Sequence, residues 1–157
     1  MNVHEIRRQC LEVMATGPAV FITIIGEDGF PRTRAMLNLR NRTQYPNHIH
    51  LYAQHDEDFM VFISTNTASK KLREIEANPR IGLYYSLPKS FLGLSLIGRA
   101  EVVEDLEVKR AVWVDGWEQY YSETGTPEDP DYTLLRILPV EARGWLAGTP
   151  FRFEISS

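Results

Sequence analysis

The strand pattern between residues 19 and 64 is the feature that most restricts the fold of this chain. A β-branched apolar run, AVFITII (19–25), is followed by the turn residues GEDGFP and then by RTRAMLNL (32–39), a combination typical of a hairpin. HIHLYAQ (48–54) and FMVFIST (59–65) are two further candidate strands. Parallel strands need a crossover connection of about a dozen residues or more, usually a helix, and this region contains none. The pattern therefore predicts antiparallel pairing and argues against a doubly wound α/β fold.

Strand-like segments continue through the second half of the chain. They are RIGLYYS (80–86), LGLSLIGRAEVV (92–103), TLLRILPVEARGWL (133–146) and FRFEI (151–155). Gly98 allows a bend or bulge within the second of these. Short strands without regular helix alternation predict a mainly β (α+β) protein whose antiparallel sheet closes into a small barrel, with a few helices packed outside. The 157 residues fit a single domain spanning 1–157.

Three stretches have helical spacing. The first covers residues 3–14, with Cys10 on its apolar face beside Ile6 and Met14, so this thiol is expected to be buried. The second covers about 68–77 and ends before Asn78-Pro79. Asp105 is placed to cap a third helix. The large apolar residues of that third helix are Leu106, Trp113 and Trp117.

Charge and composition exclude several classes of protein. The net charge is -4 and the pI about 5.6, so the overall field repels polyanions and nucleic acid is not an expected partner. No apolar stretch approaches the roughly 20 residues that span a bilayer, and no membrane association is expected. A single cysteine agrees with a reducing compartment, which predicts a cytoplasmic protein.

The segment STNTASKKLREIEANPR (64–80) has an unusual distribution of charge. Lys70 and Lys71 occupy the first turn of the predicted helix, where the helix dipole is positive and acidic residues are favoured. An anion bound by the free backbone N–H groups, the hydroxyls and the two ammonium groups would make the arrangement favourable, and a phosphate is the natural candidate. Solvated lysines, partly balanced by Glu74, explain the same residues. Residue chemistry alone leaves both interpretations open.

Several motifs in order along the chain resemble the pyridoxamine 5′-phosphate oxidase-like flavoproteins, especially the small bacterial branch related to general stress proteins. They are PRTRAML (31–37), FISTNTASKKLREIEANPRIGLYY (62–85), LIGRAEVVED (96–105) and LRILPVEARGW (135–145). The resemblance implies an FMN-binding split β-barrel that forms a homodimer with the cofactor at the subunit interface. Within that family, Thr65, Ser69, Lys70, Lys71 and Arg34 match the positions that hold the flavin phosphate. Ala35 and Met36 match positions along the isoalloxazine ring, and Trp145 matches a tryptophan that approaches the flavin from the other subunit.

The sequence departs from the true oxidases at positions that concern the substrate. Leu39 and Arg40 stand where the family has a substrate lysine, and FRFEI, with Arg152, stands where it has an arginine-histidine pair. Gly93 stands where a glutamine contacts the flavin. The resemblance therefore implies FMN binding and an oxidoreductase acting on an unidentified small molecule. A flavin-binding module without turnover, and related split barrels that bind F420 or haem, are the alternatives, and no catalytic residue is assigned.

Two further clusters have simpler explanations. His48, His50 and His55, with the HDED segment (55–58), contain ligand types suited to a metal or, for haem, to an axial position. Their spacing matches no known metal motif, and a polar strand edge followed by an acidic turn is the preferred interpretation. The aromatic segment WVDGWEQYY (113–121) is rich enough in aromatic residues to form a stacking surface, but its helical spacing favours packing on the barrel or on a partner subunit.

Overall fold

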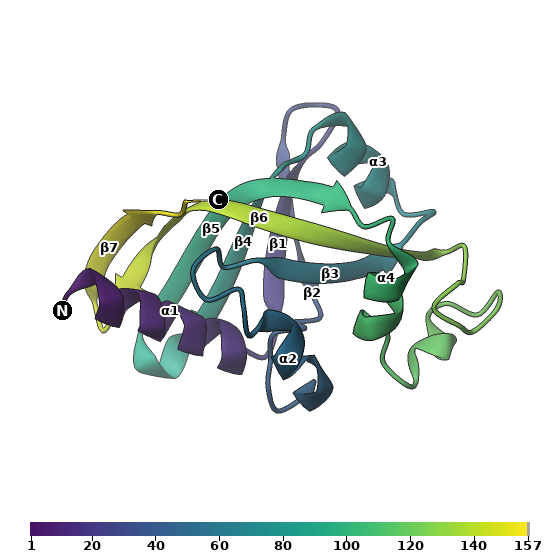
Figure 1. The fold of residues 1–157 in the computed structure, drawn as a ribbon. Helices are drawn as coiled ribbons and strands as arrows, with labels where there is room; N and C mark the ends of the chain where they lie inside the picture. The colour runs from purple at the N-terminus through teal and green to yellow at the C-terminus, as the bar shows by residue number, and fades with distance from the viewer. Residues whose placement is uncertain (157) are drawn as a thin grey trace.

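The computed structural model describes residues 1–156, and within them the sheet has seven strands that are all antiparallel to their neighbours. The strand order is β2-β1-β4-β5-β6-β3, and β7 also pairs with β6 (Figure 1). The strands are β1 (Val20–Ile25), β2 (Pro31–Met36), β3 (Val61–Asn66), β4 (Arg80–Leu87), β5 (Leu92–Val102), β6 (Tyr132–Leu146) and β7 (Thr149–Glu154). Strands β2 and β3 end the path and do not pair with each other, so the sheet curves into a barrel that stays open at this seam. The predicted antiparallel split β-barrel is confirmed.

The helices lie around this barrel. The α-helices are α1 (Val3–Thr16), α2 (Ile49–Tyr52), α3 (Lys70–Ala77) and α4 (Leu106–Val112), and short 3-10 helices cover Pro46–His48, Pro88–Ser90 and Trp117–Gln119. Asn2 caps α1 and forms a reciprocal capping box with Glu5, which satisfies backbone donors that the first turn leaves free. No helix within residues 1–156 has the length and apolar character needed to cross a membrane.

The core occupies the inside of the barrel, and α1 covers one side of it. Cys10 and Met14 are buried on the inner face of α1, as predicted, and Ile6 packs against the same cluster. Burial raises the pKa of the Cys10 thiol to about 12, so the thiol stays protonated at neutral pH. A second cluster around Tyr132 joins α4 to the outer parts of β3 and β6.

The bulge predicted at Gly98 is present, because the register between β5 and β6 shifts between Ile97 and Gly98. A Cβ atom on Gly98 would lie 2.3 Å from the Leu138 carbonyl oxygen, a distance that no side chain can occupy. The glycine therefore lets β5 bend while it stays paired with β4 on one side and β6 on the other.

The predicted strand at 48–54 is wrong, since this segment is helical. Pro46 begins the 3-10 helix that leads into α2, and its ring fixes a φ suited to a helical first position. The His48 side chain turns inward, and its Nε2 lies 2.7 Å from the Val112 carbonyl oxygen at the end of α4. This contact, between residues far apart in the sequence, accompanies the helical structure.

The predicted third helix is divided into two pieces. Asp105 caps α4 as expected, with its side chain accepting from the Glu107 N–H. The helix ends at Val112, and Trp117 begins a separate 3-10 helix. The C-cap Trp113 has ψ of 138°, which ends α4, and Gly116, the N-cap of the 3-10 helix, has φ of 101°, a left-handed conformation that suits glycine.

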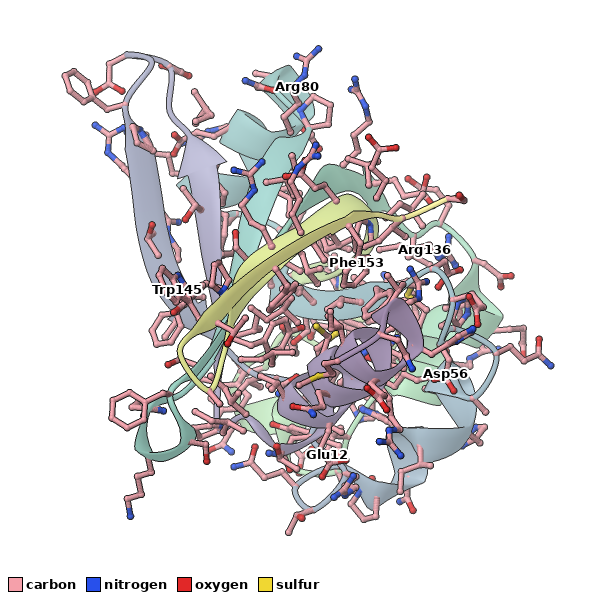
Figure 2. All side chains as sticks on the ribbon, turned by 90° about the vertical axis from the view of Figure 1, so that its left-hand side faces the viewer. Glu12, Asp56, Arg80, Arg136, Trp145 and Phe153 are labelled. Atoms are coloured by element: carbon pink, nitrogen blue, oxygen red, sulfur yellow. The ribbon has the colours of Figure 1, made fainter. Side chains whose placement is uncertain are left out.

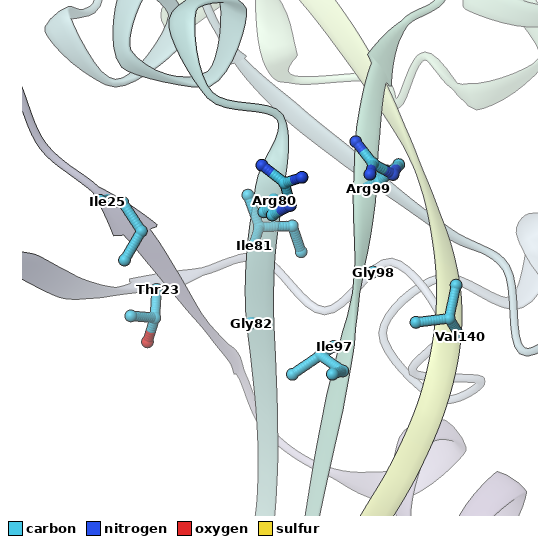
Figure 3. Close-up of a pocket in the computed structure, with 9 residues that line it drawn as sticks. All are labelled: Thr23, Ile25, Arg80, Ile81, Gly82, Ile97, Gly98, Arg99 and Val140. Atoms are coloured by element: carbon cyan, nitrogen blue, oxygen red, sulfur yellow. The ribbon is translucent and has the colours of Figure 1, made fainter. Parts of the chain in front are cut away.

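The outer face of the sheet, here called the outer sheet face, is apolar and exposed across β1, β4, β5 and β6. Its large exposed apolar side chains are Phe21, Tyr84, Ile97, Leu138, Val140 and Trp145. At one end Arg80 and Arg99 are directly opposed on β4 and β5, and Figure 3 shows them side by side above a hollow of about 470 Å³. Neither arginine forms an ion pair with a carboxylate in residues 1–156. An exposed apolar surface of this extent is typical of an interaction site.

Candidate functional site

The open seam of the barrel brings together four residues predicted to hold a phosphate. Arg34 lies on β2, one edge of the seam, and Thr65 lies on β3, the other edge. Ser69 is the N-cap of α3 and accepts from the Lys71 N–H at 3.2 Å. The Lys71 ammonium donates to Thr65 Oγ1 at 2.5 Å and to Ser69 Oγ at 3.4 Å. We call Arg34, Thr65, Ser69 and Lys71 the cation cluster.

Lys71 is the unusual member of the cation cluster, because a charged side chain there is only 6% exposed. In residues 1–156 its ammonium has hydroxyl partners and forms no ion pair with a carboxylate. Burial lowers the pKa of Lys71, and the positive charge of Arg34 lowers it further. Burying an ammonium without a counter-charge is costly. The donor set of two cations, two hydroxyls and a helix N-terminus fits a phosphate.

Lys70 was predicted to share this role, and the structure places it differently. It is exposed at the first position of α3, whereas Lys71 is buried. Successive residues on a helix point about 100° apart, so the two adjacent lysine side chains leave the helix in different directions. Lys70 therefore lies outside the cluster of contacts that Lys71 makes.

A cavity of about 430 Å³ opens beside the cation cluster, and we call it the seam cavity. It is lined by Pro18, Ala19, Ala35, Met36, Leu37, Ser64, Thr65, Asn66, Trp117, Tyr120 and Tyr121. Thr65 belongs to both the cavity and the cation cluster, so the two are continuous. Ala35 and Met36, predicted to lie along a flavin ring, are therefore on the wall of a cavity next to the predicted phosphate position.

Sequence reasoning did not place Trp117, Tyr120 and Tyr121 in this site. The signal was the density of aromatic residues in WVDGWEQYY, which we interpreted as packing. Packing is part of the role, since Trp117 and Tyr121 are buried among Trp113 and Tyr132. Tyr120, by contrast, is 55% exposed and lines the seam cavity.

Trp145 does not join the cavity residues of its own chain. It lies on β6 and is exposed (Figure 2). It is 57% exposed and lines a separate hollow of about 400 Å³ with Tyr84, Arg143 and Phe151. Its position on the outer sheet face agrees with the expectation that it serves a site on another subunit, which stays a prediction.

The positions that depart from the true oxidases have compensating neighbours. The Tyr84 hydroxyl lies where a side chain on Gly93 would be, 2.4 Å from the position of a Cβ atom. Arg152 donates to the Glu141 carboxylate, which also accepts from Arg143. Hydrogen bonds from Arg143, which has the larger effect, and from Arg152 lower the pKa of Glu141. This carboxylate therefore stays ionised and offsets part of the positive charge of the two arginines.

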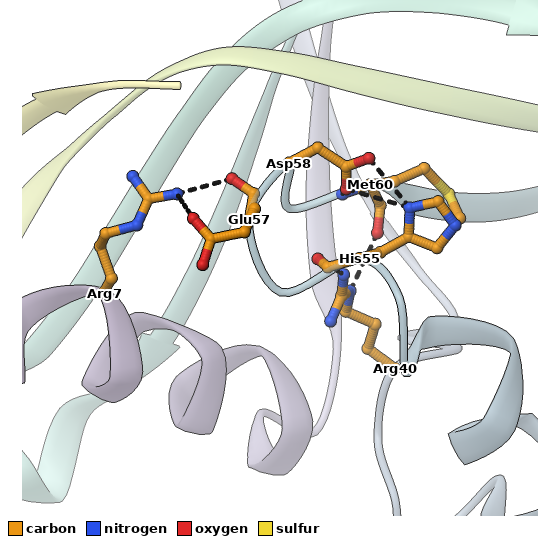
Figure 4. A network of polar contacts seen from close by, with 6 residues as sticks. All are labelled: Arg7, Arg40, His55, Glu57, Asp58 and Met60. Carbon is orange, nitrogen blue, oxygen red and sulfur yellow. Dashed lines mark hydrogen bonds and ion pairs between the residues drawn. The ribbon is translucent and has the colours of Figure 1, made fainter. Parts of the chain in front are cut away.

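The three histidines considered for metal or haem do not come together. His55 Nδ1 lies 3.0 Å from Asp58 Oδ2, next to the buried Arg40 that donates to the carbonyls of His55 and Met60 (Figure 4). Nε2 of the buried His48 contacts a backbone carbonyl, and burial lowers the pKa of this side chain. Over residues 1–156, no three His, Cys, Asp or Glu side chains are grouped as a metal site.

Proton uptake gives a test of the buried ammonium. Burial and Arg34 lower the pKa of Lys71 from the ordinary lysine value of 10.5. At a pH between the lowered pKa and 10.5, more of the protein molecules therefore carry a neutral Lys71 than an ordinary lysine would. A bound phosphate favours the charged form and raises the pKa again. We therefore expect the binding of a phosphate compound, with FMN as the probe, to take up protons in that pH range. Calorimetry in buffers of different ionisation enthalpy measures this uptake, and Lys71→Met should abolish it. Uptake that persists in Lys71→Met would contradict the assignment.

The fold and the cation cluster define a class of protein: an open antiparallel barrel with a phosphate-type cation cluster at its seam. The family model for pyridoxamine 5′-phosphate oxidase matches residues 6–146, and the chain belongs to this family. No curated protein matches the sequence at a significant level.

Solved structures agree with this family membership. A Clostridium acetobutylicum protein related to general stress protein 26 of B. subtilis, of the pyridoxinephosphate oxidase family, is 25% identical, with a TM-score of 0.77, and the match covers 98% of this chain and 97% of that one. General stress protein 26 from Bacillus anthracis has 18% identity and a TM-score of 0.72 over 96% and 99% of the two chains. A heme binding protein from Mycobacterium smegmatis has 14% identity and a TM-score of 0.67, covering 94% of this chain and 57% of that protein. The last two likenesses concern the fold alone.

Proposed function

We propose that this protein binds FMN at the seam of the barrel and acts as an FMN-dependent oxidoreductase on a small molecule. The observation that carries the proposal is the buried Lys71 ammonium, held by two hydroxyls and close to Arg34, with no carboxylate partner in residues 1–156. Arg34, Thr65, Ser69 and Lys71 would hold the phosphate, and Ala35 and Met36 would lie along the ring. A phosphomonoester has a charge approaching about -2 at neutral pH, which balances the two cations.

The chemistry of such a protein belongs to its cofactor. Bound flavin supplies hydride and electron transfer, while the protein provides the cavity, the orientation and the hydrogen bonds. Tyr121 faces the seam cavity as a neutral phenol, since burial raises its pKa and the Ser64 hydroxyl only partly opposes this. We also propose that the protein is cytoplasmic.

A flavin-binding module without turnover is the second candidate. Arg152, which stands where the family has its substrate arginine-histidine pair, donates to Glu141, so this substrate position has no free equivalent. Haem has less support than flavin, because His48 Nε2 contacts a backbone carbonyl and His55 is paired with Asp58.

We propose that the protein forms a homodimer through the outer sheet face. The support is the row of exposed apolar side chains across four strands, which includes Ile97 and Val140 near its centre. Trp145 lies on this face and, in a dimer, would approach the flavin of the other subunit.

The absorption spectrum of the purified protein, followed by titration with FMN, tests the cofactor. A flavin spectrum or saturable quenching of FMN fluorescence is expected, and absence of both would exclude FMN binding. Competition with F420 then identifies the preferred flavin. Turnover is tested separately: reduction of the bound flavin by a nicotinamide cofactor, and its reoxidation by a small-molecule acceptor, distinguish the enzyme from the binding module.

A further inference from the structure

The lining of the seam cavity contains no charged side chain. It consists of small, apolar, hydroxyl, amide and aromatic groups, and the cation cluster adjoins the cavity at Thr65. A second anionic group placed in this cavity would lose its hydration without gaining a cationic partner, which is unfavourable. The lining therefore selects against a substrate with its own phosphate or carboxylate.

The aromatic wall is held in place by packing and by β3. Trp117 and Tyr121 are buried, with ring centroids 6.2 Å apart in an edge-on arrangement. Asn66 on β3 donates to the Tyr120 carbonyl oxygen at 3.2 Å and to Asp131 Oδ2 at 2.6 Å. Because Asn66 directly follows Thr65, the segment with Tyr120 is fastened to the strand that also carries the cation cluster. The wall is thus preorganised next to the predicted cofactor.

The exposed ring of Tyr120 is the part of this wall that a ligand can cover. It lines the cavity together with Leu37 and Pro18 and is exposed, so a ligand in the cavity can reach this residue. Planar aromatic compounds gain both apolar burial and favourable ring geometry on such a surface. Neither contribution requires a charge on the ligand.

We propose that the seam cavity takes an uncharged planar aromatic compound, such as a quinone, as its substrate class, with Tyr120 as the residue that determines this specificity. This inference rests on the proposed FMN function for the identity of the site: the phosphate would satisfy the cations, the flavin ring would lie along Ala35 and Met36, and the aromatic wall of Trp117, Tyr120 and Tyr121 would contact the second ligand. It departs from the phosphorylated substrate implied by the family description.

Calorimetric titration of the FMN-loaded protein with two matched probes tests the proposal. The probes are 2-methyl-1,4-naphthoquinone, which is neutral, and 1,4-naphthoquinone-2-sulfonate, which carries a negative charge on the same ring system. We expect the neutral quinone to bind at least about tenfold more tightly, as an unpaired charge requires. Equal or tighter binding of the sulfonate would overturn the proposal.

Variants at Tyr120 assign the effect to the wall. Tyr120→Ala should weaken binding of the neutral quinone by about three- to tenfold, because ring stacking is lost, and Tyr120→Phe should retain it. Phe30→Ala is the matched control, since Phe30 is an exposed aromatic residue on the β1–β2 turn, outside the cavity lining. An unchanged affinity in Tyr120→Ala, or an equal loss in Phe30→Ala, would refute the role of Tyr120.

The same titrations separate this proposal from the FMN proposal. FMN affinity is measured first, by quenching of its fluorescence, for the wild type and each variant. Calorimetry also detects quinone binding to the flavin-free protein, so a protein that does not bind FMN still gives a result. Neutral selectivity without FMN binding would refute the cofactor and keep the cavity assignment. FMN binding without a preference for the neutral quinone would keep the cofactor proposal and refute the cavity assignment.

Discussion

Replacing Lys71 by methionine is expected to weaken FMN binding by about 30- to 150-fold and to stabilise the flavin-free protein. The loss corresponds to about 2–3 kcal/mol for a charge-assisted hydrogen bond in a buried site. The gain in stability has the opposite cause: without a bound anion the buried ammonium is unfavourable, and an apolar side chain of similar length removes that cost. FMN fluorescence quenching and thermal unfolding of the flavin-free protein measure the two effects.

Lys70→Met is the matched control for this prediction. Lys70 is the preceding residue and is exposed, so its removal takes away only a screened charge near the helix N-terminus. We expect a loss of FMN affinity of less than about fivefold, since such charges contribute about 1 kcal/mol or less, and little change in stability. Equal losses in the two variants, or an undiminished affinity in Lys71→Met, would show that Lys71 does not contact the phosphate.

The difference between Lys70 and Lys71 also shows what the sequence can predict at this site. Local signals were sufficient for α3: Ser69 provides the cap, Asn78-Pro79 ends the helix, and both act over a few residues. Lys71 lies four residues before the buried Ile75, so helical periodicity contains the information that it faces inward. The sequence pattern does not separate the two lysines, because lysine is almost never fully buried unless it is paired.

The aromatic wall shows what sequence patterns could not provide. Asn66 contacts the carbonyl of Tyr120 across 54 residues, and no local periodicity encodes that approach. The same holds for His48, whose contact with Val112 spans 64 residues and accompanies a helix where the pattern indicated a strand. In contrast, the β1–β2 hairpin and the bulge at Gly98 follow from turn and glycine chemistry within a few residues, and both are confirmed.

Ile97→Glu is expected to convert the proposed homodimer into a monomer. Ile97 is 46% exposed near the centre of the outer sheet face, with Gly82 on one neighbouring strand and Val140 lining the same hollow. A carboxylate there would be desolvated against apolar groups of the partner, and a symmetric interface contains the substitution twice. We expect the dissociation constant of the dimer to increase by more than about 100-fold, as measured by sedimentation across a range of protein concentrations.

The matched control is Ile49→Glu, because Ile49 is 54% exposed on α2, away from this face. It should leave the dimer intact, and circular dichroism should show both variants folded.

The monomer also tests whether the flavin site includes the other subunit. If Trp145 reaches the flavin from the other subunit, Ile97→Glu should weaken FMN binding by about tenfold, through loss of one aromatic contact. The cation cluster lies within one chain and should still bind the phosphate. A monomeric Ile97→Glu variant with wild-type FMN affinity would place the whole flavin site in a single subunit, and an Ile97→Glu variant that stays dimeric would show that the subunits meet through another surface.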